Sequence, residues 1–213
     1  IEKTAGLLVT RGIVAGDIVA VVMKNSAAFI EIAFAASHIG AVFLPVNYRL
    51  AAEEVSYITH HAGAKLAFAD AEFSALVGAL DNVILVDTNA QSDSTRLAGD
   101  LPPAPIHVAG PDDLFRLMYT SGTTDRTKGV IHTYGNFYWK NADHVVALAL
   151  TADDRLLVTG PLYHVGAFDL PGMAMLWVGG TICIHRDFDP MAALRSIEEE
   201  RLTGAWFAPV MLS

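Results

Sequence analysis

Residues 18–45 read IVAVVMKNSAAFIEIAFAASHIGAVFLP, and this stretch decides the fold class. Its first six residues, Ile18–Met23, are mostly β-branched and have polar or glycine residues on both sides, which is typical of a buried strand. Ser26 suits the N-cap of a helix over Ala27–Ile39, which a glycine then ends. Ala41–Pro45 follows as a second buried strand. A strand, a helix and a strand in succession predict a parallel sheet with covered faces.

The same alternation of short β-rich runs and helical patterns continues through the chain. Further strands are predicted at Lys65–Ala69, Val83–Val86, Leu114–Tyr119, Gly129–Thr133, Arg155–Thr159, Thr181–His185 and Gly204–Ala208. Further helices are predicted at Ala52–His61, Glu72–Leu80, Asn136–Leu150, Phe168–Trp177 and Met191–Arg201. The proline-rich residues 88–111 read as a surface connection. We therefore predict an α/β fold of layered, mostly parallel sheets with flanking helices.

Composition excludes several functional classes. The 213 residues carry a formal net charge of −9 and no run of five like charges, which argues against a nucleic-acid partner. Cys183 is the single cysteine, so an intrachain disulfide is impossible and a reducing, cytoplasmic location is expected. The longest apolar stretch, 27–46, contains Glu31, His38 and Pro45, so we predict a buried helix and strand there and no transmembrane segment.

The segment with the clearest chemistry is 119–130, YTSGTTDRTKGV. Hydroxyl groups and backbone N–H groups wrap phosphate oxygens, a glycine permits close approach of the backbone, and the lysine neutralises charge. The segment is not a Walker loop, because Thr127 replaces the second glycine and Gly129 replaces the Ser/Thr of that pattern. From composition alone, a polar hairpin connection whose hydroxyls cap turns stays open as the alternative.

YTSGTTDRTKGV resembles the signature phosphate loop of the adenylate-forming superfamily, which comprises acyl-CoA synthetases, luciferases and the adenylation domains of peptide synthetases. The usual pattern is [YF]TSG[ST]TGxPKG[VA], and this chain differs at Asp125, where Gly is usual, and at Thr127, where Pro is usual. The resemblance implies that the loop holds the phosphates of ATP. The residues implied in nucleotide binding are Thr120, Ser121, Gly122, Thr123, Thr124, Lys128 and Gly129.

A second match lies downstream. Residues 160–168, GPLYHVGAF, are similar to the P-[LM]-[FYH]-H-x-x-[GA] segment of the family, which lines the acyl-adenylate site. The resemblance implies that His164 lies against the acyl and phosphate groups. Without the first motif, His164 reads better as a loop histidine bonded to backbone.

Weaker similarities extend over nearly the whole chain, including GIVAGDIVAVVM near its start and LTGAWFAPVMLS at its end. The latter resembles the strand and turn that begin to wall the acyl pocket. The implied pocket residues are Trp206, Phe207 and Pro209, which suit an aromatic or an aliphatic acid.

The resemblance also implies parts that this sequence does not contain. Family members are more than twice this length and carry a Mg²⁺-binding Glu, a ribose-binding Asp, a hinge and a C-terminal domain with a catalytic Lys. The sequence does not begin with Met. We expect a fragment of the large N-terminal domain, with residues 1–150 as a first α/β subdomain, 151–213 as the beginning of a second, and the C-terminal domain absent.

By resemblance, the parent protein is an ATP-dependent acid–thiol ligase, an acyl-CoA synthetase expected in fatty acid metabolism. A carboxylic acid attacks the α-phosphate of ATP, giving acyl-AMP and pyrophosphate, and coenzyme A then takes the acyl group. Lys128 and His164 are the implied catalytic residues, with Thr124 near Mg²⁺, and this chain alone is expected to be inactive. The alternatives are a non-catalytic nucleotide-binding module, an adenylation domain of a peptide-synthetase system, and a structural fragment that binds no nucleotide. Neither the acid nor the oligomeric state follows from the sequence.

Two other groups of residues were considered, one as a metal site and one as a hydrolase triad, and the sequence supports neither. His60 and His61 are adjacent on a predicted helix and point about 100° apart, which is poor geometry for one metal ion. Ser121, His164 and Asp169 contain the residue types of a hydrolase triad, but Ser121 lacks the G-x-S-x-G elbow because a tyrosine replaces its first glycine.

Overall fold

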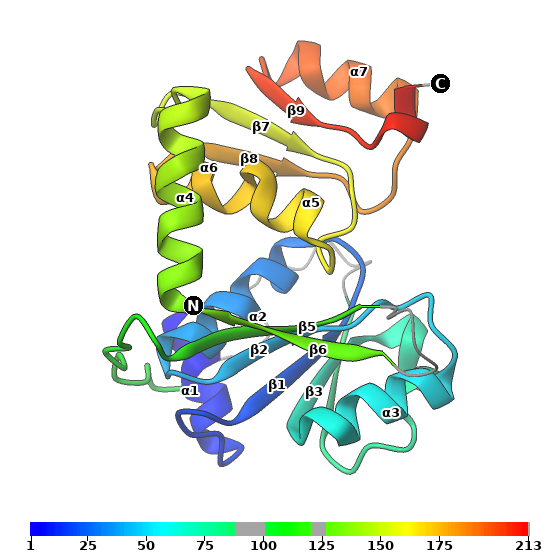
Figure 1. Cartoon of the computed structure of the whole chain (residues 1–213). Coiled ribbons are helices and arrows are strands. Elements are labelled where there is room, and N and C mark those ends of the chain that lie inside the picture. Colours follow the sequence, from blue (N-terminus) through cyan, green and yellow to red (C-terminus); the bar gives the residue numbers. More distant parts are fainter. Residues whose placement is uncertain (88–100, 121–126, 213) are drawn as a thin grey trace. The chain divides into compact units, whose positions relative to one another are not determined.

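The computed structural model describes residues 1–87, 101–120 and 127–212 (Figure 1). Contacts divide the chain into two compact units, one of Ile1–Met23 with Ala27–Asn136, the other of Lys24–Ser26 with Phe137–Ser213. The sequence places a division near residue 150, whereas contacts assign residues from Phe137 onward to the second unit.

The first unit is built on a six-stranded sheet in the order β4-β3-β1-β2-β5-β6. All neighbouring strands are parallel except β5 and β6, which form an antiparallel hairpin at one edge. The strands are β1 (Ile18–Val22), β2 (Val42–Pro45), β3 (Ala64–Asp70), β4 (Val83–Val86), β5 (Leu114–Thr120) and β6 (Lys128–Thr133). The mostly parallel sheet predicted from the sequence is therefore confirmed.

Helices cover both faces of this sheet, which explains why its central strands are apolar throughout. On one face, Ala20 and Leu44 pack with Val55 and Ile58 of helix α3 (Ala52–Ala62) and with the short helix η1 (Ala71–Val77). On the other, Phe43 meets Phe29 of helix α2 (Ala27–His38) edge to face, with ring centroids 5.6 Å apart. Successive strand residues point to opposite faces, so a strand covered on both sides loses the polar alternation of an exposed one.

Helix α1 (Glu2–Thr10) was not predicted from the sequence. Its N-cap is Ile1, which supplies no side-chain hydrogen bond, and Gly6 and the β-branched residues within it have low helix propensity. Leu7 and Leu8 are nevertheless buried, and α1 packs against α2. A Cβ at Gly6 would overlap the carbonyl oxygen of Pro102, so the glycine permits a close approach. Tertiary packing, rather than local propensity, accounts for this helix.

The second unit contains a three-stranded parallel sheet in the order β8-β7-β9. Its strands are β7 (Arg155–Val158), β8 (Thr181–Ile184) and β9 (Gly204–Trp206). Helix α7 (Pro190–Glu199) packs against β7, and its N-cap Asp189 accepts a hydrogen bond from the Ala192 N–H. Helix α4 (Tyr134–Leu148) has its residues from Phe137 onward in this unit.

The single helix predicted over Phe168–Trp177 is wrong. The structure has α5 (Val165–Phe168), a π-type turn η3 (Asp169–Met173) and α6 (Ala174–Trp177), with a cis peptide bond before Pro171. Proline lacks the N–H that a continuous helix needs, which breaks the pattern there. A short 3₁₀ helix, η4 (Pro209–Leu212), follows β9 where no helix was predicted.

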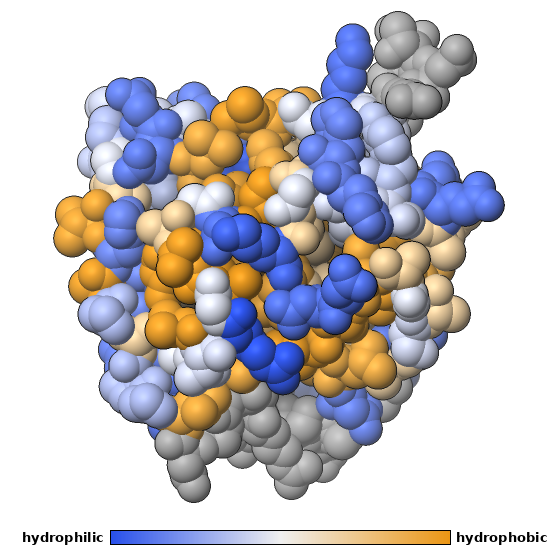
Figure 2. All heavy atoms as spheres, turned by 90° about the horizontal axis from the view of Figure 1, so that it is seen from below, coloured by the Kyte–Doolittle hydropathy of each residue, from blue (hydrophilic) through white to orange (hydrophobic). Residues whose placement is uncertain are grey.

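Figure 2 shows one face of the molecule, on which apolar and polar side chains alternate over short distances. Among the helices of residues 1–87, 101–120 and 127–212, none has both the length and the apolar character needed to cross a bilayer.

Candidate functional site

The β5–β6 hairpin carries the predicted phosphate loop as its connection. Thr120 at the end of β5 pairs with Lys128 at the start of β6, and both side chains are exposed. The register therefore brings the first hydroxyl and the lysine of the motif side by side, at the carboxyl end of β5. Ser121, Gly122, Thr123 and Thr124 lie outside the described residues, as does Asp125.

Tyr119 fixes the base of the hairpin. Its hydroxyl lies 2.6 Å from Nδ1 of His61 on α3, and the two rings meet edge to face. Tyr119 pairs across the strands with Gly129, where a Cβ would lie only 3.2 Å from two atoms of the tyrosine ring. Glycine is therefore the residue that allows this ring to lie over the backbone of β6. Burial, together with the neighbouring Tyr57 hydroxyl, raises the pKa of the Tyr119 phenol, so it stays protonated as a hydrogen-bonding group.

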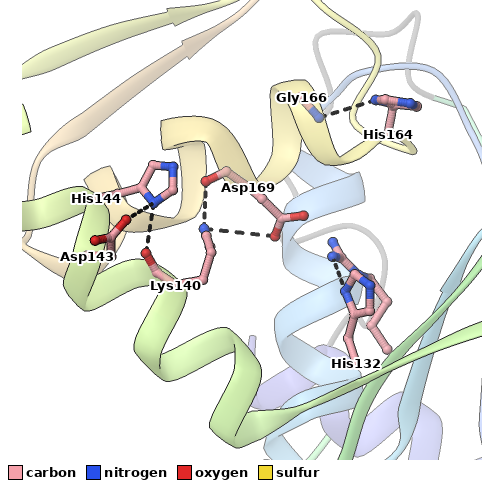
Figure 3. A network of polar contacts seen from close by, with 8 residues as sticks. His132, Lys140, Asp143, His144, His164, Gly166 and Asp169 are labelled. Atoms are coloured by element: carbon pink, nitrogen blue, oxygen red, sulfur yellow. Dashed lines mark hydrogen bonds and ion pairs between the residues drawn. The ribbon is translucent and has the colours of Figure 1, made fainter. Parts of the chain in front are cut away.

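A buried arginine lies in the same hairpin. Arg116 is 2% exposed, and one of its terminal nitrogens lies 2.6 Å from Nδ1 of His132 on the paired strand (Figure 3). A guanidinium can only donate, so Nδ1 of His132 is the acceptor and the ring proton of neutral His132 lies on Nε2.

In the second unit, the segment that follows β7 carries His164. The Trp206 indole of β9 lies in a slot formed by Gly160 and Gly166, where a Cβ at either glycine would overlap the ring. The hydroxyl of Thr159 donates to the Trp206 carbonyl oxygen at 3.1 Å. The structure thus brings Trp206 together with the segment that precedes and follows His164.

His164 is exposed and begins helix α5 as its N-cap (Figure 3). Its Nδ1 accepts a hydrogen bond from the Gly166 N–H at 3.2 Å. An accepting Nδ1 places the proton of the neutral ring on Nε2, which is then free of this bond and available to donate. His164 is thus both a helix cap and a candidate donor to a ligand.

The other predicted pocket residues are less closely associated with His164. The Phe207 ring packs against Phe188, with centroids 6.2 Å apart. Pro209 is exposed and begins η4. Among residues 137–212, no hydrogen bond or ring contact joins either of these side chains to His164.

The arrangement of Asp169 argues against the hydrolase alternative. Its backbone carbonyl accepts a hydrogen bond from Nζ of Lys140 at 2.6 Å, and its carboxylate lies 3.9 Å from the same ammonium group (Figure 3). His164 uses its Nδ1 to accept from Gly166. A triad requires that histidine to donate from Nδ1 to the aspartate, which these contacts do not provide.

A pocket of about 290 Å³ lies at the opposite edge of the first sheet from the phosphate loop. It is lined by residues at the end of α3, at the start of β3 and just before β4, including His60, Lys65 and Asn82. None of the predicted site residues lines it. Within the described part of the chain, no group of three or more His, Cys, Asp or Glu side chains is placed to hold a metal ion.

Comparison with known proteins identifies the family. The model of the family described as AMP-binding enzyme matches residues 1–213, which is the whole chain. The chain belongs to the AMP-binding enzyme family. Its α/β architecture agrees with this assignment, and the resemblance inferred from YTSGTTDRTKGV is confirmed.

Two relatives of this chain are named as enzymes that form CoA thioesters. It is 36% identical to a feruloyl-CoA synthase of an Amycolatopsis species over 99% of its length, and 31% identical to an indoleacetate–CoA ligase of Aromatoleum aromaticum over 100% of its length. It covers 42% and 44% of those proteins, respectively, so it spans less than half the length of the relatives it matches.

A solved structure extends the likeness to the fold of the AMP-binding family. The o-succinylbenzoate CoA synthetase of Bacillus subtilis, solved with its acyl-adenylate intermediate, superposes with a TM-score of 0.87 at 25% identity. The superposition covers 99% of this chain and 54% of the solved chain.

Sequence reasoning missed the residues that hold each of the two candidate segments in place. His61, which bonds Tyr119, lies 58 residues from its partner, and Asn25 bonds the His164 segment from 135 residues away. One signal was available for Asn25, because it is a polar residue just beyond the carboxyl end of a buried strand, where α/β proteins place their sites.

Proposed function

We propose that the protein carrying this chain activates a carboxylic acid with ATP and transfers the acyl group to coenzyme A. The observation that carries the proposal is the β5–β6 hairpin, whose paired ends hold Thr120 and Lys128 of the phosphate-loop motif within a chain of the AMP-binding enzyme family. Two relatives are named for the formation of a CoA thioester, and a solved neighbour contains an acyl-adenylate.

In this proposal the acid carboxylate attacks the α-phosphate of ATP, and pyrophosphate leaves. Lys128 and the hydroxyl groups of residues 120–124 hold the β- and γ-phosphates, so the negative charge of the leaving pyrophosphate is stabilised electrostatically. Tyr119 contributes by holding the base of the loop on α3. A thiolate of coenzyme A then attacks the acyl carbon and releases AMP.

His164 is proposed to lie against the acyl-adenylate. The His164 residue is exposed, and Nε2 of the neutral ring carries the proton because Nδ1 accepts from Gly166, so the ring presents one hydrogen-bond donor. The Trp206 indole, held between Gly160 and Gly166, is proposed to wall the acyl pocket together with Phe207 and Pro209.

Mg²⁺ is proposed to accompany ATP as the counter-ion of its phosphates, with Thr124 near it. Thr124 lies outside the described residues, and within the described ones no group of three or more His, Cys, Asp or Glu side chains is placed to hold a metal ion. We therefore assign no step to the ion. A cytoplasmic location also stays a proposal.

The acid is proposed to belong to the broad class of organic acids that the relatives use. The names of the relatives include feruloyl, indoleacetate and long-chain fatty acid. An assignment to fatty acid metabolism is therefore narrower than these relatives support. Because the chain covers 42% of the feruloyl-CoA synthase, we propose that the complete reaction needs segments corresponding to the rest of that protein.

Thioester formation tests the proposal directly. The whole protein is incubated with ATP, Mg²⁺ and coenzyme A and with aryl, aryl-acetic and fatty acids, and the products are identified by mass spectrometry. The expected result is an acyl-CoA and AMP with at least one acid. ATP binding without AMP release for every acid would instead support a non-catalytic nucleotide-binding module.

A further inference from the structure

The side chain of Asn25 is buried between two strand ends of the second unit. It is 5% exposed and lies in the short segment Lys24–Ser26, which belongs to that unit. Its Nδ2 donates to the carbonyl oxygen of Gly160 at 2.7 Å and to that of His185 at 3.0 Å. Its Oδ1 accepts from the Leu162 N–H at 2.8 Å.

These three bonds need an amide at this position. Gly160 and His185 follow β7 and β8 and present carbonyl oxygens, while Leu162 presents an N–H, so the side chain must donate twice and accept once. A carboxylate would accept from Leu162 but would face two carbonyl oxygens without a proton to donate. A small apolar side chain would leave three buried backbone groups without their partner.

The bonds of Asn25 fix the backbone that leads to His164. The side chain spans Gly160 and Leu162 and so holds the turn through Pro161, whose carbonyl oxygen accepts from the His164 N–H at 3.0 Å. The turn is followed immediately by the α5 N-cap, where Nδ1 of His164 accepts from Gly166. A shift of this turn therefore changes the direction of the imidazole.

We propose that Asn25 is a positioning residue for His164, acting through the 160–162 turn. The orientation of the ring follows from the contacts above, and the effect on catalysis rests on the proposed function of His164 at the acyl-adenylate. Asn25 itself touches no reacting atom in this proposal.

The first experiment needs no substrate. In the whole protein, the ¹⁵N shifts of the His164 ring are measured in wild type, Asn25→Ala and Asn25→Asp, after circular dichroism and thermal unfolding have confirmed that each variant folds. Wild type is expected to show an unprotonated Nδ1 and a protonated Nε2, with well-separated shifts. Both variants are expected to move the two shifts toward each other, because the bond from Gly166 weakens. If Asn25→Ala does not fold, Asn25→Asp, which keeps the size of the side chain and the acceptor for Leu162, provides the test.

The second experiment separates positioning from general destabilisation. Asn25→Ala is expected to lower kcat for adenylation about 10- to 100-fold, since small misplacements of a site group have effects of that size. KM for ATP is expected to change less than about 2-fold, because the Asn25 bonds lie outside the phosphate-binding hairpin. In a His164→Ala background the same Asn25→Ala change is expected to have little further effect on kcat. The matched control is Lys24→Met, which removes the neighbouring ion pair to Asp187 (3.0 Å) and is expected to leave kcat within about 2-fold.

The outcomes distinguish the positioning role of Asn25 from the proposed function of His164. A folded Asn25→Ala protein with unchanged His164 shifts would overturn the proposal, as would additive losses of kcat in the double variant. Altered shifts in a protein that adenylates no acid would leave the positioning role intact and contradict the proposed function instead.

Discussion

The β5–β6 hairpin and the segment 160–168 are built in opposite ways. In the hairpin, Thr120 and Lys128 are exposed at the paired strand ends, and a hydrogen bond between Tyr119 and His61 ties the base to a helix. In 160–168, the backbone is held on one side by the three bonds of Asn25 and on the other by the Trp206 indole.

This difference explains why a binding loop can be recognised in a sequence more easily than the contacts that position a segment. A phosphate loop uses neighbouring residues on one short piece of chain, so its chemistry can be recognised as a local motif. The segment 160–168 is instead held by Asn25 and by the Trp206 indole, whose association with Gly160 and Gly166 depends on the tertiary fold. Changes in the hairpin should therefore alter ligand binding, and changes around the segment 160–168 should alter stability and geometry.

The largest effect is expected at Lys128. Lys128→Ala should weaken ATP binding about 10- to 100-fold, because a charge-assisted hydrogen bond to phosphate contributes roughly 1.5–3 kcal/mol. Isothermal titration calorimetry with Mg-ATP measures the change. The matched control is Lys3→Ala, at an exposed position of α1, which should leave the affinity unchanged. Equal affinities for wild type and Lys128→Ala would contradict the assigned phosphate contact.

A smaller effect, on stability, is expected at Gly166. A Cβ there would overlap the Trp206 indole, so Gly166→Ala should lower the free energy of unfolding by about 1–3 kcal/mol, the usual cost of overpacking. Urea denaturation measures the loss. Gly204→Ala is the control, since its Cβ would make only an ordinary contact of 3.6 Å with Leu156. Equal stabilities of the two variants would argue against a tight slot for Trp206.

Tyr119→Phe tests the tie between the hairpin and α3. The change removes the hydrogen bond to His61 and keeps the ring over Gly129, so a loss of about 1 kcal/mol in unfolding free energy is expected. A modest rise in KM for ATP should accompany it, because the base of the loop loses its link to the helix. If the unfolding free energy from chemical denaturation and the KM for ATP both equal those of wild type, the Tyr119–His61 bond does not support the loop.

The smallest effect is expected at Asp17, which immediately precedes β1 in the first unit. Burial acts to raise the pKa of its carboxyl, but hydrogen bonds from Lys65 and the Val14 N–H, with the charge of Lys65, lower it overall. A lowered pKa stabilises the fold above the unfolded value of about 3.9, and this contribution is lost as the pH falls through the folded value. Asp17→Asn should therefore lower stability by about 0.5–1 kcal/mol at neutral pH, with the difference from wild type shrinking toward pH 3. Unfolding curves at both pH values measure it, and a difference that grows on acidification would contradict the assignment.

Local sequence patterns predicted the central βαβ unit and the family, because strand burial and the 119–130 motif both depend on consecutive residues. They did not predict α1, whose stability comes from packing on α2, or the break at Pro171, where a helical pattern conceals a π-type turn. Motifs indicated Lys128 and His164 as candidate site residues. The hydrogen-bond partners of the two segments, His61 and Asn25, were not indicated, because long-range hydrogen bonds leave no local periodicity.

Carboxylate-dependent ATP–pyrophosphate exchange by the whole protein tests the central claim most directly, because it isolates the adenylation step from thioester formation. The account predicts exchange that requires an organic acid and falls strongly in Lys128→Ala, while Lys3→Ala remains close to wild type. Two results would contradict the account. One is exchange that is equally fast in Lys128→Ala and wild type, and the other is a protein that binds ATP but shows no exchange with any acid.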